Sequence, residues 1–393
     1  MGELNQDQIF AFFEANKWKV NGFTDQIFEI SGAAGTGKTY SAKYILSELG
    51  YDIMREVLWV AYTGKAATQL ARNGLPAITC HSAFYEPKII PVYDDNGNPV
   101  YKANGKRKTK IEFRKKEYLK KRYKIIAIDE ATMVNEDMKN DILSFGLPIL
   151  ALGDMNQLPP VFGAPAFMQH PNVELRQLMR QAENDPIIYI AHMILDGKYL
   201  RRGVYGKSAI IGKKDLTEFQ LKSADIILTG TNRLRGEINN LFRNTYYNYP
   251  KPEFPYVGEK VICRKNNWSK SIANGIYLTN GITGFLEYVS RESYNGRKIL
   301  VDFRPDFCNV GFHNLNIDYK HLMQKESSPN DSLFKYDLDV FEFAYAITIY
   351  SSQGSQWENV VSLAELYGSD DFQRSALYTM VTRASKSQIL VMP

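Results

Sequence analysis

The residues of this chain that are best suited to chemistry lie in one glycine-rich segment. Residues 32–39 read Gly-Ala-Ala-Gly-Thr-Gly-Lys-Thr, with an apolar strand-like run before them and a helical pattern after them. A loop between a strand and a helix presents backbone N–H groups to a polyphosphate at the positive end of the helix. The segment therefore predicts a site for a nucleoside triphosphate. The alternative is a glycine-rich turn that binds no ligand.

Each residue type in this segment has a task in that prediction. The glycines let the backbone turn and approach the phosphates, Lys38 reaches the β- and γ-phosphates, and Thr39 ligates Mg²⁺ through its hydroxyl. The predicted ATP-binding loop comprises Gly32, Ala33, Ala34, Gly35, Thr36, Gly37, Lys38 and Thr39.

Two further segments place polar residues at the end of an apolar run. Asp129 and Glu130 follow Ile125–Ile128, and Gln157 lies in Leu152–Pro160. A carboxylate at a strand end can hold Mg²⁺, and its neighbour can deprotonate the attacking water. We predict the first role for Asp129, the second for Glu130, and a γ-phosphate or water sensor in Gln157. The alternatives are a helix N-terminus for the acids and a plain loop for the glutamine.

Apolar β-rich runs alternate with helical patterns along most of the chain. This alternation favours the α/β class, with parallel sheets covered by helices on both faces. We expect helices over Asn232–Tyr246 and Asp371–Ala384. Residues 86–123, which carry an Asn96-Gly97 hairpin signal, and residues 251–340, which carry short runs between glycine-rich turns, break the alternation. The runs expected as strands are Val57–Ala61, Ile125–Ile128, Pro148–Leu152, Ala224–Thr229, Phe343–Ile349 and Ser387–Met392.

Composition and charge narrow the class of protein. A chain of 393 residues suggests two to four domains. The net charge is +5, and the stretch from Lys102 to Lys124 holds twelve Lys or Arg and two Glu. Such a basic block is either a solvated surface or a contact with nucleic-acid phosphates.

Three scattered cysteines fit a reducing compartment. We see neither a secretory signal nor a long apolar run, so we expect a cytoplasmic protein that has no membrane contact.

Besides residues 32–39, 129–130 and 153–160, six further segments form an ordered series of motifs: Leu4–Gln8, Tyr62–Ala67, Ile78–Ser82, Leu178–Gln181, Thr348–Gln356 and Val381–Ala384. This series gives the chain a resemblance to the superfamily 1 helicases, most closely to the RecD-like, phage Dda-type branch of superfamily 1B. One departure lies at Tyr350-Ser351, where the family usually has His-Lys before Ser-Gln-Gly. Trp357, which follows that motif, is expected in the core.

The resemblance implies an ATP-dependent DNA helicase that moves 5′→3′ on single-stranded DNA and unwinds duplex. It implies that Gln8 reads the adenine, that Gly354 contacts the nucleotide, and that Arg180 and Arg383 reach the γ-phosphate. Both arginines lie far from Lys38 in the sequence. The nucleotide must therefore lie in a cleft between two domains, which opens and closes as ATP is hydrolysed.

The resemblance also implies a path for single-stranded DNA across both domains. Its predicted contacts are mostly small polar residues, which suit binding to the backbone without base readout. For His81 the alternative is a structural histidine, and for Asn232 it is a helix cap. The predicted DNA-binding residues are Thr63, Lys65, Thr79, His81, Asn232, Thr348 and Ser352.

The implied architecture has two RecA-like parallel-sheet motor domains with two insertions. Residues 1–85 and 124–175 form the first motor domain, and residues 176–250 and 341–393 form the second. Residues 86–123 form a hairpin subdomain, and residues 251–340 form a small SH3-like β-barrel. Tyr93 and Tyr101 flank the hairpin turn and are the predicted strand-separation wedge.

The expected partners and the alternative functions follow from the same motifs. We expect a monomer that binds single-stranded DNA and single-strand–duplex junctions, with single-strand-binding or replication proteins as protein partners, in a bacterial or phage-infected cytoplasm. An RNA helicase or a protein-displacing translocase of the same superfamily is the alternative, because small polar contacts do not discriminate DNA from RNA. A binding protein switched by nucleotide would be favoured by a degenerate site, whereas this site retains every catalytic residue type.

Overall fold

The first lobe is built on a six-stranded sheet in the order β3-β2-β6-β7-β1-β8, in which all neighbouring strands are parallel. The computed structural model describes residues 4–94, 97–101, 107, 109–159, 165–179, 184–251, 253–272, 276–290, 296–323 and 338–393. Central strands are apolar and buried on both faces, as parallel strands between helices must be. The strands are β1 (Ile27–Gly32), β2 (Val57–Ala61), β3 (Ile78–Thr79), β6 (Ile125–Asp129), β7 (Ile149–Gly153) and β8 (Val173–Leu175).

Several helices of this lobe begin at side-chain caps. Asn5 and Gln8 form a capping box at the start of α1, and Thr63 and Thr79 cap α3 and α4. Helix α2 begins directly after Gly37, which has a left-handed φ of 79°. The helices are α1 (Gln6–Val20), α2 (Lys38–Glu48), α3 (Gly64–Arg72), α4 (Cys80–Phe84), the 3₁₀ turn η1 (Ala131–Met133) and α5 (Glu136–Leu143).

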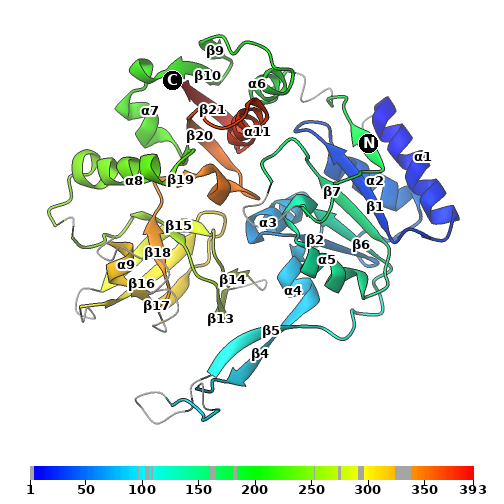
Figure 1. Cartoon of the computed structure of the whole chain (residues 1–393), viewed down its shortest axis with the longest axis horizontal. Coiled ribbons are helices and arrows are strands. Elements are labelled where there is room, and N and C mark those ends of the chain that lie inside the picture. The colour runs from blue at the N-terminus through cyan, green and yellow to red at the C-terminus, as the bar shows by residue number, and fades with distance from the viewer. Residues whose placement is uncertain are drawn as a thin grey trace.

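A long hairpin projects from the first lobe (Figure 1). Strand β4 (Tyr85–Pro91) pairs antiparallel with β5 (Thr109–Lys115). A second, smaller turn lies beyond them, where Val100 N–H donates to the carbonyl of Val92 and Tyr93 bridges to Pro99. This turn lies where the Asn96-Gly97 signal predicts it, although Asn96 is outside the described residues. The paired arm itself extends further than the sequence predicted.

The second lobe contains another six-stranded sheet, in the order β19-β11-β20-β21-β10-β9. Its strands are parallel except for the edge pair β9–β10. The strands are β9 (Gly203–Tyr205), β10 (Ser208–Gly212), β11 (Ile226–Thr229), β19 (Ala346–Thr348), β20 (Trp357–Leu363) and β21 (Ala384–Met392). The helices are α6 (Pro186–Leu195), η2 (Lys213–Asp215), α7 (Glu218–Ser223), α8 (Asn232–Leu241), the π-helical turn η3 (Phe242–Tyr246), η5 (Ile349–Ser352) and α11 (Asp370–Val381).

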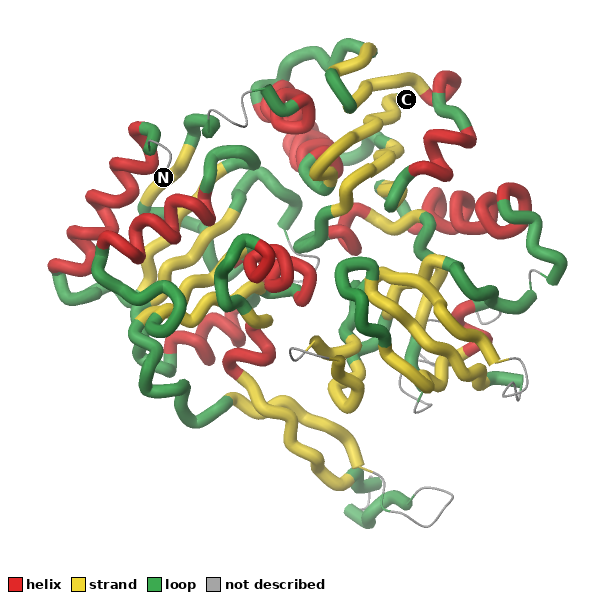
Figure 2. Tube along the Cα trace, turned by 180° about the vertical axis from the view of Figure 1, so that it is seen from behind, coloured by secondary structure: helices red, strands yellow, loops and turns green. Residues whose placement is uncertain are grey.

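A five-stranded antiparallel sheet, in the order β17-β16-β15-β12-β18, lies beside the second lobe (Figure 2). Its two edges approach each other, because Asp318 N–H donates to the carbonyl of Asp339 just before β18. A separate pair, β13–β14, extends from it. The elements are β12 (Lys260–Cys263), β13 (Asn267–Ile272), β14 (Ile276–Leu278), β15 (Thr283–Ser290), β16 (Lys298–Pro305), β17 (Phe312–Asp318), α9 (Tyr319–Leu322) and β18 (Phe341–Phe343).

The predicted α/β class with parallel sheets is confirmed, and three local predictions need correction. The run Phe343–Ile349 is divided between two sheets, because Phe343 belongs to β18 and residues 346–348 form β19. The helix expected to reach Ala384 ends at Val381, and Ala384 begins β21. The helix expected over Asn232–Tyr246 changes to a π-helical turn at Phe242.

Candidate functional site

The glycine-rich segment forms the turn between β1 and α2, as predicted. The ammonium of Lys38 donates to the carbonyl oxygens of Gly32 at 2.7 Å and Ala33 at 3.3 Å, so it lies over the loop. A Cβ atom at Gly37 would come within 2.4 Å of the Met179 sulfur. Only glycine fits that close approach with a positive φ.

A hydroxyl from the start of α2 and a carboxylate from the end of β6 meet beside the loop. Thr39 Oγ1 donates to Asp129 Oδ2 at 3.2 Å. Burial raises the pKa of Asp129, against the opposing effects of Lys38, the Glu130 N–H and Thr39. Both are hard oxygen ligands of the kind that Mg²⁺ prefers, with phosphate oxygens and water completing its shell. The pair is therefore suited to hold a magnesium ion.

Glu130 lies next to this pair in an uncommon backbone conformation. Its φ of 53° is left-handed, which is rare for a residue other than glycine and concentrates at functional sites. Burial raises the pKa of its carboxyl, and the charge of Arg383 from the second lobe opposes that rise. The guanidinium of buried Arg383 donates to the carbonyls of Thr379 and Ser355. The structure thus brings Glu130 and Arg383 from two lobes near each other.

Two predicted site residues, Gln157 and Gln8, are each held by a side-chain hydrogen bond. Gln157 Nε2 donates to Asp154 Oδ2 at 3.4 Å. Gln8 is buried and donates to the carbonyl of Thr36 at 3.2 Å, while its Oε1 accepts from Asn5 N–H. Arg180 lies outside the described residues. Its neighbour Met179 donates its N–H to the carbonyl of Gly35 at 3.0 Å, so this segment reaches the loop.

The two lobes meet at Gly354 of the segment 348–356. Its carbonyl accepts from Thr63 Oγ1 at 2.8 Å, and a Cβ atom there would lie 2.6 Å from Thr63 Cγ2. Beside it, Gln353 Nε2 donates to the carbonyl of Leu158 at 2.6 Å. Gly354 and Thr63, predicted to bind nucleotide and DNA respectively, thus contact each other across the seam.

Lys65 is held between the second lobe and the antiparallel sheet. Its ammonium lies 3.6 Å from Asp306 Oδ1 and 3.7 Å from the centre of the Trp357 ring. Trp357 is buried, as predicted, and its indole N–H donates to Asp306 Oδ2 at 2.7 Å. Burial lowers the pKa of Lys65 to about 8, although Asp306 opposes the shift. A phosphate bound by Lys65 would have to replace Asp306.

This lowered pKa makes a prediction for pH-dependent stability. The ordinary lysine pKa of about 10.4 applies to the unfolded chain, which therefore binds more protons than the native protein between about pH 8 and 10. The free energy of unfolding of the wild type, relative to Lys65→Met, should increase over that range by at most about 3 kcal/mol. Urea unfolding of both proteins at several pH values measures this difference. Parallel stability curves would contradict the buried, titrating amine.

The other predicted DNA contacts differ in their exposure. Thr79 and Thr348 cap short helical turns through their hydroxyls. Asn232 is exposed at the start of α8, and the cap of that helix is Thr231, so the alternative of a capping role for Asn232 is wrong. Ser352 is fully buried and its hydroxyl donates to the carbonyl of Ile349, so we leave it out of the proposed DNA path.

His81 belongs to an aromatic cluster that the sequence did not reveal. Its ring centre lies 5.1 Å from that of Trp268 on β13 and 5.7 Å from that of Tyr85. Phe113 on β5 lies 4.3 Å from Trp268. Burial lowers the pKa of His81. The cluster connects the base of the hairpin arm to the β13–β14 pair, and the isolated Trp268 between Asn267 and Ser269 was its only sequence signal.

A basic group also reaches the turn where the family's His-Lys is missing. Arg264, the residue directly after β12, donates to Ser351 Oγ at 3.1 Å and to Glu342 at 2.8 Å. Burial opposes ionisation of Glu342, but the His321 hydrogen bond and the charges of Arg264 and Arg235 hold its pKa well below the usual range. Sequence reasoning missed this arginine because it lies 87 positions from Ser351 in the chain.

The predicted wedge tyrosines lie at the far end of the hairpin arm. Tyr93 and Tyr101 are 53% and 61% exposed. The Arg107 guanidinium lies over the Tyr93 ring, 5.4 Å from its centre, and donates to its hydroxyl. Two large aromatic side chains therefore remain accessible at this tip, far along the arm from the lobes.

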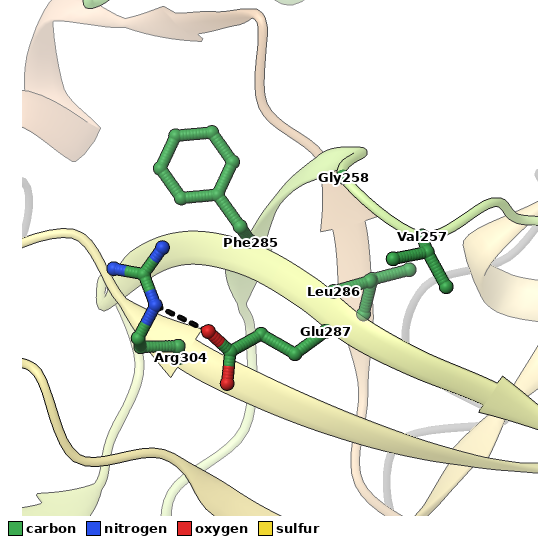
Figure 3. Close-up of a pocket in the computed structure, with 6 residues that line it drawn as sticks. All are labelled: Val257, Gly258, Phe285, Leu286, Glu287 and Arg304. Atoms are coloured by element: carbon green, nitrogen blue, oxygen red, sulfur yellow. Dashed lines mark hydrogen bonds and ion pairs between the residues drawn. The ribbon is translucent and has the colours of Figure 1, made fainter.

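A surface pocket lies on the antiparallel sheet, apart from these residues. Arg304 donates to Glu287 across it (Figure 3). None of the predicted site residues lines it, so we assign it no part in the site. Its lining residues are Val257, Gly258, Phe285, Leu286, Glu287 and Arg304.

No described helix combines the length and apolar character needed to cross a bilayer. No group of three or more His, Cys, Asp or Glu among the residues that the structure describes has the arrangement of a metal site.

The fold and the site together define a P-loop nucleoside-triphosphatase with two parallel-sheet lobes. Models of known families match both lobes: the AAA domain matches residues 18–163, and the UvrD-like helicase C-terminal domain matches residues 343–391. The ATP-dependent RecD2 DNA helicase of Deinococcus radiodurans is 25% identical, over 90% of this chain and 45% of that protein. The ATP-dependent DNA helicase Pif1 of Campylobacter jejuni is 24% identical, over 93% of this chain and 88% of that protein.

Solved structures show the same fold. The crystal structure of Bacteroides Pif1 bound to single-stranded DNA gives a TM-score of 0.50 at 16% identity, over 100% of this chain and 95% of that one. A structure of two coordinating Pif1 helicases at forked duplex DNA gives 0.52 at 17% identity, with the same coverage. The chain is similar to helicases of superfamily 1B, and its two parallel sheets form a RecA-like core that resembles that of the Pif1 helicases. It spans about half the length of the RecD2 relative.

Proposed function

We propose that this chain is an ATP-dependent DNA helicase that moves 5′→3′ along single-stranded DNA and unwinds duplex. The strongest support is the seam between the lobes beside the phosphate loop, where Thr63 donates to the carbonyl of Gly354 at 2.8 Å and the charge of Arg383 acts on Glu130. A nucleotide bound there would contact both lobes, so its hydrolysis would change how they meet. The matched relatives named as ATP-dependent DNA helicases support the same proposal.

Each residue near the loop has a role in this proposal. Lys38 and Arg383, with Arg180, stabilise the charge that develops on the transferring phosphoryl group. Glu130 takes the proton of the attacking water, and Gln157 orients that water or senses the γ-phosphate. Thr39 and Asp129 hold Mg²⁺, which when bound neutralises phosphate charge. Gln8 recognises the base beside the loop.

Single-stranded DNA would lie across the faces that carry Thr63, Lys65, Thr79, His81, Asn232 and Thr348. The hairpin arm would be the element that separates the strands of the duplex. The antiparallel sheet would form an SH3-like barrel that lies against the second lobe. The approach of Asp318 to Asp339 supports closure of that barrel. We further propose a monomer that acts at single-strand–duplex junctions.

The proposed function is tested with duplexes that carry a single-stranded tail at one end. We expect ATP-dependent unwinding of the 5′-tailed duplex and little of the 3′-tailed one. Stimulation of ATP hydrolysis by matched DNA and RNA oligonucleotides separates a DNA helicase from an RNA helicase. Stimulation by DNA without unwinding of either duplex would favour the protein-displacing translocase instead.

The exposed tyrosines of the arm give a specific prediction for unwinding. Opening a base-pair step costs about 1–2 kcal/mol, which a rigid aromatic tip can offset by stacking on the exposed base. The double variant Tyr93→Ala/Tyr101→Ala, or deletion of Asp94–Pro99, should unwind at least about fivefold more slowly and retain DNA-stimulated ATP hydrolysis. Tyr118→Ala removes another exposed tyrosine, outside the tip, and serves as the control. Unwinding at the wild-type rate would rule out the wedge.

A further inference from the structure

Tyr378 of the second lobe connects two separate segments of the first lobe through one hydroxyl. It lies on α11, which is drawn in dark red in Figure 1, and it is fully buried. Its hydroxyl accepts a hydrogen bond from the Ala34 N–H at 2.6 Å and donates one to Asp154 Oδ2 at 2.6 Å. Ala34 belongs to the phosphate loop, and Asp154 follows β7. Tyr378, to which the sequence analysis assigned no role, therefore lies at the seam between the lobes.

The orientation of this hydroxyl is determined by its partners. An amide N–H can only donate, so the hydroxyl accepts from Ala34 and must direct its own proton to the carboxylate. Burial and the nearby Asp154 charge raise the pKa of Tyr378, so the hydroxyl keeps its proton at neutral pH. The bond to Asp154 is buried and the bond from Ala34 is partly buried, and away from water hydrogen bonds are strong and the loss of a partner is costly.

Asp154 extends the connection to the predicted sensor. Its Oδ1 accepts from the Asn156 N–H at 3.0 Å, and its Oδ2 accepts from Gln157 Nε2 at 3.4 Å. The phosphate loop, Tyr378, Asp154 and Gln157 thus form one continuous hydrogen-bonded chain. Any displacement of α11 changes the support of both the loop and the glutamine.

The same end of α11 also holds the arginine of the second lobe. Thr379, next to Tyr378, accepts the Leu158 N–H on its hydroxyl at 2.9 Å. The carbonyl of Thr379 accepts from Arg383 Nε at 3.2 Å. Two neighbouring residues of α11 therefore contact the first lobe, and the backbone of one of them positions Arg383.

We propose that Tyr378 is a positioning residue for ATP hydrolysis. Its hydroxyl aligns the phosphate loop and the Gln157 segment with the helix end that carries Arg383, so that groups from both lobes reach the γ-phosphate together. Errors of about 1 Å in such alignment cost large factors in rate. This inference rests on the proposed function, because it assigns a residue to that hydrolysis.

The substitution Tyr378→Phe tests the proposal, since it keeps the ring and removes only the hydroxyl. We expect the kcat of DNA-stimulated hydrolysis to fall about tenfold or more, with the KM for ATP changed by less than about threefold. This pattern marks an interaction that matters in the transition state and not for substrate binding. A purely structural residue would lower the melting temperature without this separation of kcat from KM.

Tyr345→Phe is the matched control. Tyr345 is also buried in the second lobe, and its hydroxyl donates to a carboxylate, Glu259, at 3.4 Å. Removal of the Tyr345 hydroxyl should lower the melting temperature and leave kcat unchanged. In a double-mutant cycle with Asp154→Asn, the effects of the two substitutions on kcat should be clearly less than additive, because both break the same chain.

Three outcomes have distinct meanings. Wild-type kcat in Tyr378→Phe, or full additivity with Asp154→Asn, would overturn the positioning role while the helicase assignment stands. A wild-type protein that hydrolyses no ATP in the presence of DNA would overturn the proposed function and this inference with it. A loss of kcat that Tyr345→Phe reproduces would show a general effect of stability, and it would also overturn the positioning role.

Discussion

The variant Lys38→Ala should hydrolyse ATP at least about a hundredfold more slowly than the wild type, since a fixed positive group near the developing charge is usually the largest catalytic contribution. Lys38 is the first residue of α2, and its ammonium already lies over the loop, on the carbonyls of Gly32 and Ala33. Alanine leaves the loop without this cation. Phosphate release with saturating single-stranded DNA measures the effect.

The control for this variant is Lys43→Ala, on the same helix but exposed. It removes the same charge without approaching the loop, so hydrolysis should stay at the wild-type rate. Thermal unfolding of both variants shows whether the loss of the two loop hydrogen bonds destabilises the fold. Turnover by Lys38→Ala within about tenfold of the wild type would show that phosphates are not held here.

The variant Glu130→Gln should bind ATP and fail to turn it over. The amide is nearly the same size as the carboxylate, but it cannot accept the proton of the attacking water. Glu130 has a left-handed backbone, and the charges of Arg383 and Asp129 both act on its buried carboxyl. We expect kcat to fall by about a hundredfold or more, with the dissociation constant for ATP within about threefold of the wild type.

Equilibrium binding of a fluorescent ATP analogue, together with single-turnover hydrolysis, separates these two quantities. Glu136→Gln, an exposed acid on α5, is the matched control and should behave as the wild type. If Glu130→Gln lost binding and turnover in parallel, the carboxylate would hold the nucleotide or its metal and would not act as the base.

The sequence predicted well those features that depend on short stretches of chain. The phosphate loop, the strand that ends at Asp129 and the turn beyond Tyr93 each arise from local backbone preferences and apolar patterns. The motifs also placed Thr39 and Asp129 together, because the carboxyl ends of parallel strands lie at one edge of a sheet. The run Phe343–Ile349 was predicted as one strand because both of its halves are apolar, yet the halves enter different sheets.

Residues whose partners lie far away in the chain have neighbours that the sequence did not predict. Lys65 has the sequence context of a DNA contact, but a carboxylate 241 positions further along and the ring of Trp357 enclose it. His81 likewise faces Trp268 and Phe113, which come from two insertions with no motif of their own. Side-chain type does not encode such neighbours, because burial and charge pairing depend on how separate elements meet.

The amino-acid sequence by itself determined that this chain has a phosphate loop, two acids at a strand end and two α/β lobes, since glycine geometry and apolar periodicity act within a few residues. Only the tertiary structure decided which groups face each other across the seam. The hydroxyl of Tyr378 between Ala34 and Asp154, and the charge of Arg383 near Glu130, depend on segments more than 200 residues apart. Such contacts form only when the two lobes are packed against each other.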